Sequence, residues 1–210
     1  KALRYERDGA FEAFVKLCWS TVEPDHLEWA PFMSVVCHYV HRHILGDIDY
    51  RKLLIMLPPG TSKSLIVSVF APAYEWIIDP SYRRLFFTGN DDLSTRDSRR
   101  TRRCIKSETY QALMTEAQRR RGEKPWVFAA DQQEKRNFEN TEMGFRQCLT
   151  LQTGVTGKRG AGISVDDPID IKTVLHGSPE AIERRCSEAN ETIKQAMATR
   201  INDPRIARRL

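Results

Sequence analysis

Apolar residues along this chain occur either in short unbroken runs or at helical spacing. An unbroken run covers residues 53–57, and such a run is typical of a strand that is buried on both faces of a sheet. A second run at 85–88 predicts another buried strand, and a third, at 162–165, precedes a pair of aspartates. Helical spacing predicts helices over residues 10–20 and 30–45. Strands interspersed with helices indicate an α/β fold.

The first apolar run leads into a loop whose residues suit a nucleotide phosphate. Pro58, Pro59 and Gly60 end the run, and Lys63 and Ser64 open the amphipathic segment that follows. A strand, a tight loop and a helix N-terminus in this order present backbone N–H groups and the positive helix end to an anion. In such a loop the lysine reaches the β- and γ-phosphates, and the serine hydroxyl binds Mg²⁺. The residues expected to hold ATP are Pro59, Gly60, Thr61, Ser62, Lys63 and Ser64.

The loop departs from the usual pattern G-x-x-x-x-G-K-[ST] at two positions, where Leu57 and Ser62 replace glycine. If residue 62 needs a left-handed backbone, serine costs about 1–2 kcal/mol more than glycine. An ordinary turn from strand to helix, with Lys63 on the surface, is therefore the alternative interpretation.

Two adjacent carboxylates follow the run at 162–165. Asp166 is expected in the coordination shell of Mg²⁺, and Asp167 is expected to position or deprotonate the attacking water. Pro168 then closes the strand, because proline cannot donate a hydrogen bond to the sheet. A turn without catalytic significance is the alternative. The order of the two motifs favours a nucleotide hydrolase.

Two further groups of residues are candidates for binding. Trp29 lies upstream of the loop, where its indole is expected either to stack on adenine or to pack in the core. A cationic stripe on one helical face of residues 93–107 suits a DNA backbone or a neighbouring subunit. The stripe consists of Arg96, Arg99, Arg100 and Arg103. A solvated face paired with local acids is the alternative.

Composition adds few constraints. The net charge of +5 permits an anionic partner. No apolar run approaches the roughly 20 residues of a membrane helix, so no membrane partner is expected. The five cysteines form no CxxC pair, and we expect a reduced, cytosolic protein.

Taken in order, these motifs resemble the N-terminal ATPase domain of the large terminase subunit of tailed bacteriophages. The resemblance extends from about Trp29 to Pro204. The segments that carry it are LLIMLPPGTSKSL, AYEWIIDPS, STRDSRRTRRCIKSETYQAL, NFENTEMGFRQ, TGVTGKRGAG, ISVDDP and ATRINDP. Terminases have deviant phosphate loops of the PPxxxKS kind, so the missing glycines agree with the resemblance.

The resemblance implies an α/β P-loop NTPase of the ASCE type, with a mostly parallel central sheet flanked by helices. It implies one ATPase domain over residues 1–210, in which a helical region at 1–50 leads into a P-loop core at 51–210. A C-terminal nuclease domain is expected to be absent from this chain. The implied activity is Mg²⁺-dependent ATP hydrolysis that drives double-stranded viral DNA into a procapsid. The implied partners are DNA, the portal protein, the small terminase subunit and further copies of the chain in a ring, in the host cell cytoplasm.

Ring neighbours of this kind supply an arginine finger, worth roughly 10³–10⁵ in rate. Arg159, in a Gly-rich loop before Asp166, is the expected finger, with Arg146 as second choice and a plain surface role as the alternative. Two other functions remain open at this stage. One is a helicase-like DNA translocase, and the other is a nucleotide-binding domain without turnover.

Overall fold

The structure is a computed structural model that describes residues 4–133, 136–150, 159–169, 177–199 and 208–209. Within these ranges the chain forms an α/β fold, with a sheet of six strands and helices packed against it.

Helices dominate the first half of the chain. In chain order the helices are η1 (Arg4–Glu6), α1 (Ala10–Cys18), η2 (Trp19–Thr21), α2 (Pro31–Ile44), η3 (Ile48–Tyr50), η4 (Leu65–Phe70), α3 (Ala71–Ile78), α4 (Asp91–Lys106), α5 (Glu108–Arg121) and α7 (Pro179–Thr199). The two helices predicted before residue 50 are confirmed as α1 and α2, each of which buries one apolar face. The η4 segment is π-helical and continues directly into α3.

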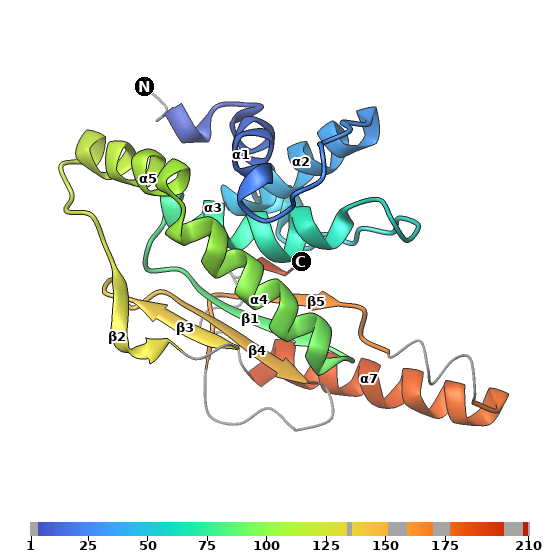
Figure 1. The fold of residues 1–210 in the computed structure, drawn as a ribbon. Helices are drawn as coiled ribbons and strands as arrows, with labels where there is room; N and C mark the ends of the chain where they lie inside the picture. The colour runs from blue at the N-terminus through green and yellow to red at the C-terminus, as the bar shows by residue number, and fades with distance from the viewer. Residues whose placement is uncertain (1–3, 134–135, 151–158, 170–176, 200–207, 210) are drawn as a thin grey trace.

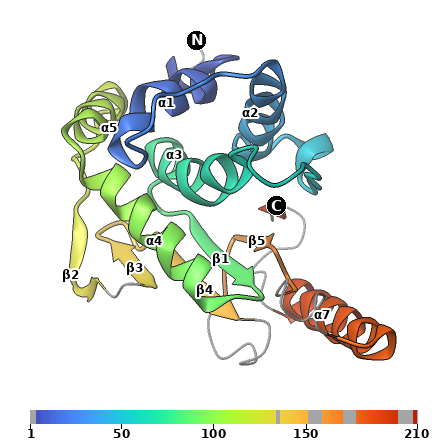
Figure 2. The ribbon, with the colours of Figure 1, turned by 45° about the vertical axis from the view of Figure 1, so that its right-hand side comes forward.

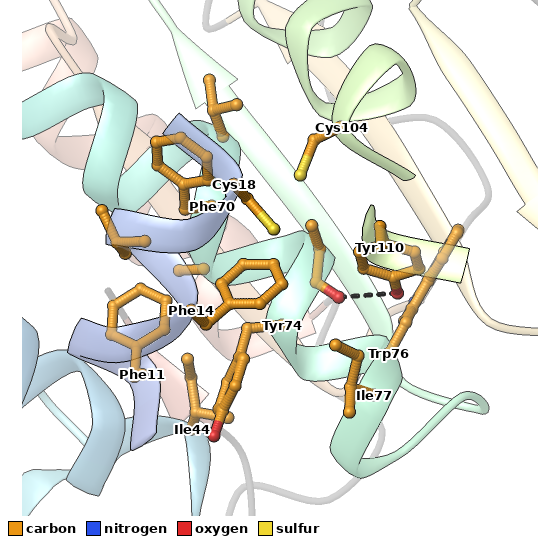
Figure 3. Close-up of a cluster of buried hydrophobic side chains, with 14 of the residues drawn as sticks. Phe11, Phe14, Cys18, Ile44, Phe70, Tyr74, Trp76, Ile77, Cys104 and Tyr110 are labelled. Carbon is orange, nitrogen blue, oxygen red and sulfur yellow. Dashed lines mark hydrogen bonds between the residues drawn. The ribbon is translucent and has the colours of Figure 1, made fainter. Parts of the chain in front are cut away.

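Aromatic packing joins α1 to the helices that follow it. The ring of Phe14 lies 5.0 Å from the ring of Tyr74 and 6.1 Å from that of Tyr110, centroid to centroid. The Tyr110 hydroxyl donates a hydrogen bond to the Ala73 carbonyl at 2.9 Å, which satisfies the polar end of a fully buried side chain. Figure 3 shows these side chains converging from α1, α3 and α5. The core therefore lies mainly among the helices.

The sheet combines parallel and antiparallel pairs. Its strands are β1 (Arg83–Thr88), β2 (Phe128–Gln133), β3 (Asn137–Asn140), β4 (Phe145–Thr150), β5 (Gly162–Asp166) and β6 (Arg208–Arg209). The order across the sheet is β2-β3-β4-β1-β5-β6. β1 pairs in parallel with β4 and β5, and β5 pairs in parallel with β6. β3 pairs antiparallel with both β2 and β4.

The prediction of a mostly parallel P-loop sheet is wrong. The sheet is mixed, because β2, β3 and β4 form an antiparallel meander. The strand predicted at residues 53–57 is also missing, although these residues lie within the described part of the chain. Leu54 is 83% exposed and Met56 is 82% exposed, so the run is not buried on both faces. Apolar composition alone could not distinguish this extended segment from a central strand.

Figures 1 and 2 show how the helices lie around the sheet. In both views α4 lies over β1 and β4, and α1, α2 and α3 are grouped together. α7 extends away from that group. Among the described residues, no helix has the length and apolarity needed to cross a membrane.

A buried ion pair ties α3 to the sheet. Arg84, on β1, donates from Nε to Glu75 Oε2 at 2.7 Å and also pairs through Nη2 with Glu75 Oε1. Its Nη1 donates to Ser164 Oγ on β5 at 2.8 Å. Both charged residues are at most 3% exposed. The pair therefore connects three elements in a place that water does not reach.

The turn before β4 approaches another part of the backbone closely. A Cβ on Gly144 would lie 2.0 Å from the Pro80 carbonyl oxygen, so no larger residue fits there without a backbone shift. Asn140 holds the same turn, because its Nδ2 donates to Pro80 O at 2.8 Å and its Oδ1 accepts from Gly144 N at 3.0 Å.

His41 is expected to make folding stability depend on pH. It is 2% exposed, and its Nε2 lies 3.0 Å from the Tyr5 carbonyl. Burial lowers the pKa of His41 below its usual value, although the Tyr5 carbonyl opposes that shift. The unfolded chain therefore takes up a proton at a higher pH than the folded chain does. The resulting stability is present above about pH 6.5 and is lost as the pH falls through the folded-state pKa.

Urea unfolding of wild type and His41→Gln at about pH 7 and about pH 5 would test this. The wild type should lose more stability on acidification than the variant does. His26→Gln, at an exposed histidine, is the control and should behave as wild type. Equal pH dependence in all three proteins would contradict the assignment.

Candidate functional site

The loop at residues 58–64 has a left-handed backbone at residue 62, which is the conformation in which serine is less favourable than glycine. Gly60 and Ser62 both have left-handed backbones, with φ of 81° and 57°. Glycine adopts this conformation freely, whereas at Ser62 it costs about 1–2 kcal/mol. Thr61 Oγ1 donates to the Pro58 carbonyl at 2.8 Å and closes the loop. Lys63 then begins the helical segment that leads into η4. Strain of this kind is typical of ligand-binding loops.

The two predicted aspartates lie at the carboxyl end of β5, next to this loop. Asp166 is the last residue of β5, and Asp167 follows it in a left-handed conformation with φ of 42°. Lys63 Nζ lies 3.8 Å from Asp167 Oδ1. The Ser68 hydroxyl donates to Asp166 Oδ2 at 2.8 Å. The structure thus brings together the two motifs that the sequence separates.

A small cavity of about 30 Å³ lies where these elements meet. Its polar lining consists of Ser64, Ser68, Thr88, Ser94, Arg96, Asp97, Arg146, Asp166 and Asp167. Arg146 Nε and Ser94 Oγ are buried there without a hydrogen-bond partner in the described part of the chain. The cavity volume matches about one water molecule, whose polar partners these atoms could be.

A larger cavity of about 570 Å³ adjoins Lys63, Asp166 and Asp167. Its remaining lining is mostly apolar and comes from residues 52–55, η4, the end of β5 and α7. These residues are Lys52, Leu53, Leu54, Ile55, Val67, Val165, Pro168 and Ile193. The volume lies within the range of small-molecule sites, in which apolar walls surround a few polar groups.

The oxygen donors of this site suit Mg²⁺ only when phosphate oxygens supply the remaining ligands. No group of three or more His, Cys, Asp or Glu side chains in the described ranges could hold a metal ion by itself. Nucleotide-associated Mg²⁺ usually takes one or two carboxylates and fills its other positions with phosphate oxygens and water. Ser64 and Asp166, which line the same small cavity, supply a hydroxyl and a carboxylate of the required kind.

Asp97 belongs to the site and has no sequence motif that marks it. It lies on α4, is 5% exposed, and accepts a hydrogen bond from Arg96 Nε at 2.8 Å. Burial raises the pKa of Asp97, and the hydrogen bond from Arg96 opposes that rise. The hydrogen bond to Asp97 also raises the pKa of Arg96. The signals available for this inward face were the small residues Ser94 and Thr101, at helical spacing from Asp97, and the apolar Cys104 and Ile105 further along.

The predicted cationic stripe is divided between different surroundings. Arg96 lines the small cavity, and Arg100 Nη2 lies 3.0 Å from Glu23 Oε2. Arg99 and Arg103 are exposed and line an open depression of about 560 Å³ with Arg102 and Lys106. Arg96 is exposed as well but is hydrogen-bonded to Asp97, so Arg99 and Arg103 remain the candidates for DNA contact.

Two other predicted residues, Trp29 and Arg159, lie outside both cavities. The indole of Trp29 donates to Ser34 Oγ at 2.9 Å and lies beneath Lys16 Nζ, which is 4.3 Å from the ring centroid. It also packs against the core, as the alternative interpretation expected. Arg159 is exposed and precedes β5, at the opposite end of the strand from Asp166.

Arg146, the second choice for a finger, is buried inside the molecule. It is 2% exposed, its Nη2 donates to the Ser68 carbonyl at 3.0 Å, and its guanidinium lies 4.0 Å from the ring centroid of Phe86. A side chain held in this way is not presented to a neighbouring subunit. Arg146 instead contributes to the site of its own chain.

Comparison with protein-family models, with curated proteins and with solved structures finds no match to this chain. Function must therefore be argued from the residues of the site.

Proposed function

We propose that this chain binds ATP with Mg²⁺ and hydrolyses it at the site formed by Lys63, Ser64, Asp166 and Asp167. The observation that carries the proposal is the approach of Lys63 Nζ to within 3.8 Å of Asp167 Oδ1. A lysine at the start of a helix and paired acids at the end of a strand are the parts that phosphoryl transfer needs. The left-handed loop and the adjoining cavity support the same interpretation.

Each residue has a defined task in this proposal. Lys63 would leave Asp167 and pair with phosphate oxygens, which frees the Asp167 carboxylate to orient a water molecule and accept its proton. Ser64 and Asp166 would hold Mg²⁺, which neutralises charge on the phosphates when it is bound. The backbone N–H groups of residues 60–64 would face the anion at the helix start.

The biological role proposed for this activity is the packaging of viral DNA by a terminase motor. It rests on the order of motifs described above and on the exposed Arg99 and Arg103. In this role the partners are double-stranded DNA, the portal protein, the small terminase subunit and further copies of the chain in a ring, within the host cytoplasm. The exposed Arg159 would act as a finger on the site of the next copy.

The deciding experiment is phosphate release from ATP with and without Mg²⁺, in the presence and absence of long duplex DNA. Mg²⁺-dependent release that duplex DNA stimulates supports the packaging ATPase. Tight ATP binding without release indicates a nucleotide-binding domain, for which the strained Ser62 is the structural argument. Separation of the duplex strands indicates a helicase. Absence of nucleotide binding overturns the proposal.

Replacing both Arg99 and Arg103 with alanine is expected to weaken DNA binding and reduce its salt dependence. Each lost phosphate contact should flatten the slope of log K against log salt by about 0.9, because fewer counterions are released. Binding of labelled duplex across a salt series measures the slope.

The matched control replaces Arg119 and Arg120, two arginines on α5 that both pair with Glu116. The control should leave the slope unchanged. A slope that is the same in both double variants would exclude Arg99 and Arg103 as DNA contacts.

A further inference from the structure

We infer that Ser68 is a positioning residue that fixes the Asp166 carboxylate for metal binding. The inference rests on the proposed function, and it assigns a task to a residue outside both sequence motifs. Ser68 Oγ donates to Asp166 Oδ2 at 2.8 Å, and the serine is 2% exposed. A bond of this kind, shielded from water, sets the rotation of the carboxylate before any ligand arrives.

The position of Ser68 on its helix suits this task. Ser68 follows Ser64 by four residues, so the two hydroxyls lie about one helical turn apart on the same side. Both serines line the small cavity together with Asp166. Ser64 is thus available to the metal, while Ser68 holds the carboxylate that shares it.

The backbone of Ser68 is anchored separately from its side chain. In an α-helix the Ser68 carbonyl would accept from the N–H of residue 72, but residue 72 is proline and has no N–H. Arg146 Nη2, from β4, donates to this carbonyl at 3.0 Å, and Thr101 Oγ1, from α4, lies 3.4 Å from it. The helix is π-helical at this point, a form found often at functional sites.

Through Ser68, these contacts connect η4, β4 and α4 to the Asp166 carboxylate at the end of β5. Arg146 and Thr101 hold the Ser68 carbonyl, and the hydroxyl of the same residue reaches β5. Because the carbonyl and the hydroxyl of Ser68 both make hydrogen bonds, Ser68 can hold the Asp166 carboxylate in one orientation. Loss of the hydroxyl alone should leave the backbone anchor and the fold intact.

The test measures binding of Mn²⁺ in the presence of ADP, followed by electron paramagnetic resonance. Mn²⁺ accepts the same oxygen ligands as Mg²⁺. Ser68→Ala should weaken Mn²⁺ binding by about 10–100-fold, as removal of an outer partner of a metal ligand typically does. Binding of ADP without metal should change little, because Lys63 and the loop are untouched.

Ser98→Ala is the matched control. Ser98 is another fully buried serine, on α4, and its hydroxyl has no hydrogen-bond partner in the described part of the chain. This variant should bind Mn²⁺ and ADP as wild type does.

Three results would overturn the inference. If Ser68→Ala binds Mn²⁺ as tightly as wild type, the Ser68 hydroxyl does not position Asp166, although the proposed function stands. If Ser98→Ala is weakened equally, the effect comes from general packing. If wild type binds neither ADP nor Mn²⁺ with ADP, the proposed function fails and the inference fails with it.

Discussion

Asp167→Asn is expected to slow ATP hydrolysis by about 10²–10⁴-fold while ATP binding persists. The amide keeps the size of the side chain but cannot accept a proton from water. It also removes the negative charge that lies 3.8 Å from Lys63 Nζ, so phosphate oxygens lose a competitor for the lysine. Steady-state phosphate release and equilibrium binding of a fluorescent ATP analogue measure the two quantities separately.

Two comparisons make this result specific. Asp92→Asn, at an exposed acid in the first turn of α4, should turn over at the wild-type rate. Asp166→Asn should weaken Mg²⁺-dependent binding as well as turnover. If Asp167→Asn lost nucleotide binding and Asp166→Asn kept it, the roles assigned to the two aspartates would be wrong.

Glu75→Ala is expected to destabilise the fold by about 3–5 kcal/mol, since it leaves the Arg84 guanidinium buried without its carboxylate. Arg84 would keep its hydrogen bond to Ser164 but would lose both contacts to Glu75. Urea or thermal unfolding, followed by circular dichroism, measures the change.

An apolar double variant separates charge burial from packing. Replacing Glu75 with leucine and Arg84 with methionine together should recover most of the lost stability, because no buried charge then lacks a partner. Glu116→Ala, which breaks the exposed contacts to Arg119 and Arg120, should change stability little. A small effect of Glu75→Ala would contradict the expectation.

The sequence predicted helices whose burial is one-sided and local, and it also predicted the short buried strands β1 and β5. The first helix was predictable because Phe11, Phe14 and Cys18 mark one face over two turns. The run at 53–57 was misread because apolar composition does not report how many faces a segment buries. Its neighbours in space decide that, and they come from elsewhere in the chain. The antiparallel meander that makes the sheet mixed depends on the same kind of distant pairing.

The residues of the candidate site also fall into two groups, those that the sequence could predict and those that it could not. Lys63 and Asp167 were predictable because each sits at a junction between a regular element and a loop, where the chemistry is visible in a short motif. Ser68 was not predictable, since a serine within an apolar helix carries no local sign that a distant carboxylate accepts its hydrogen bond. Arg96 is exposed, as its place in the stripe predicted, but helical spacing gives only the direction of a side chain relative to its neighbours and could not show that Arg96 also pairs with Asp97. Helical spacing does not reveal what the helix packs against.

The close contact at Gly144 has a consequence for how the hairpin of β3 and β4 can pair. A slip of one residue along the chain would place the side chain of Met143 or Phe145 against the Pro80 carbonyl, where even a Cβ on residue 144 would lie at 2.0 Å. A slip of one residue turns every side chain of a strand to the opposite face of the sheet. Gly144 therefore helps to fix the register in which β3 and β4 pair. It keeps Arg146 directed toward Ser68, so a turn far from the aspartates helps determine which residues can meet at the candidate site.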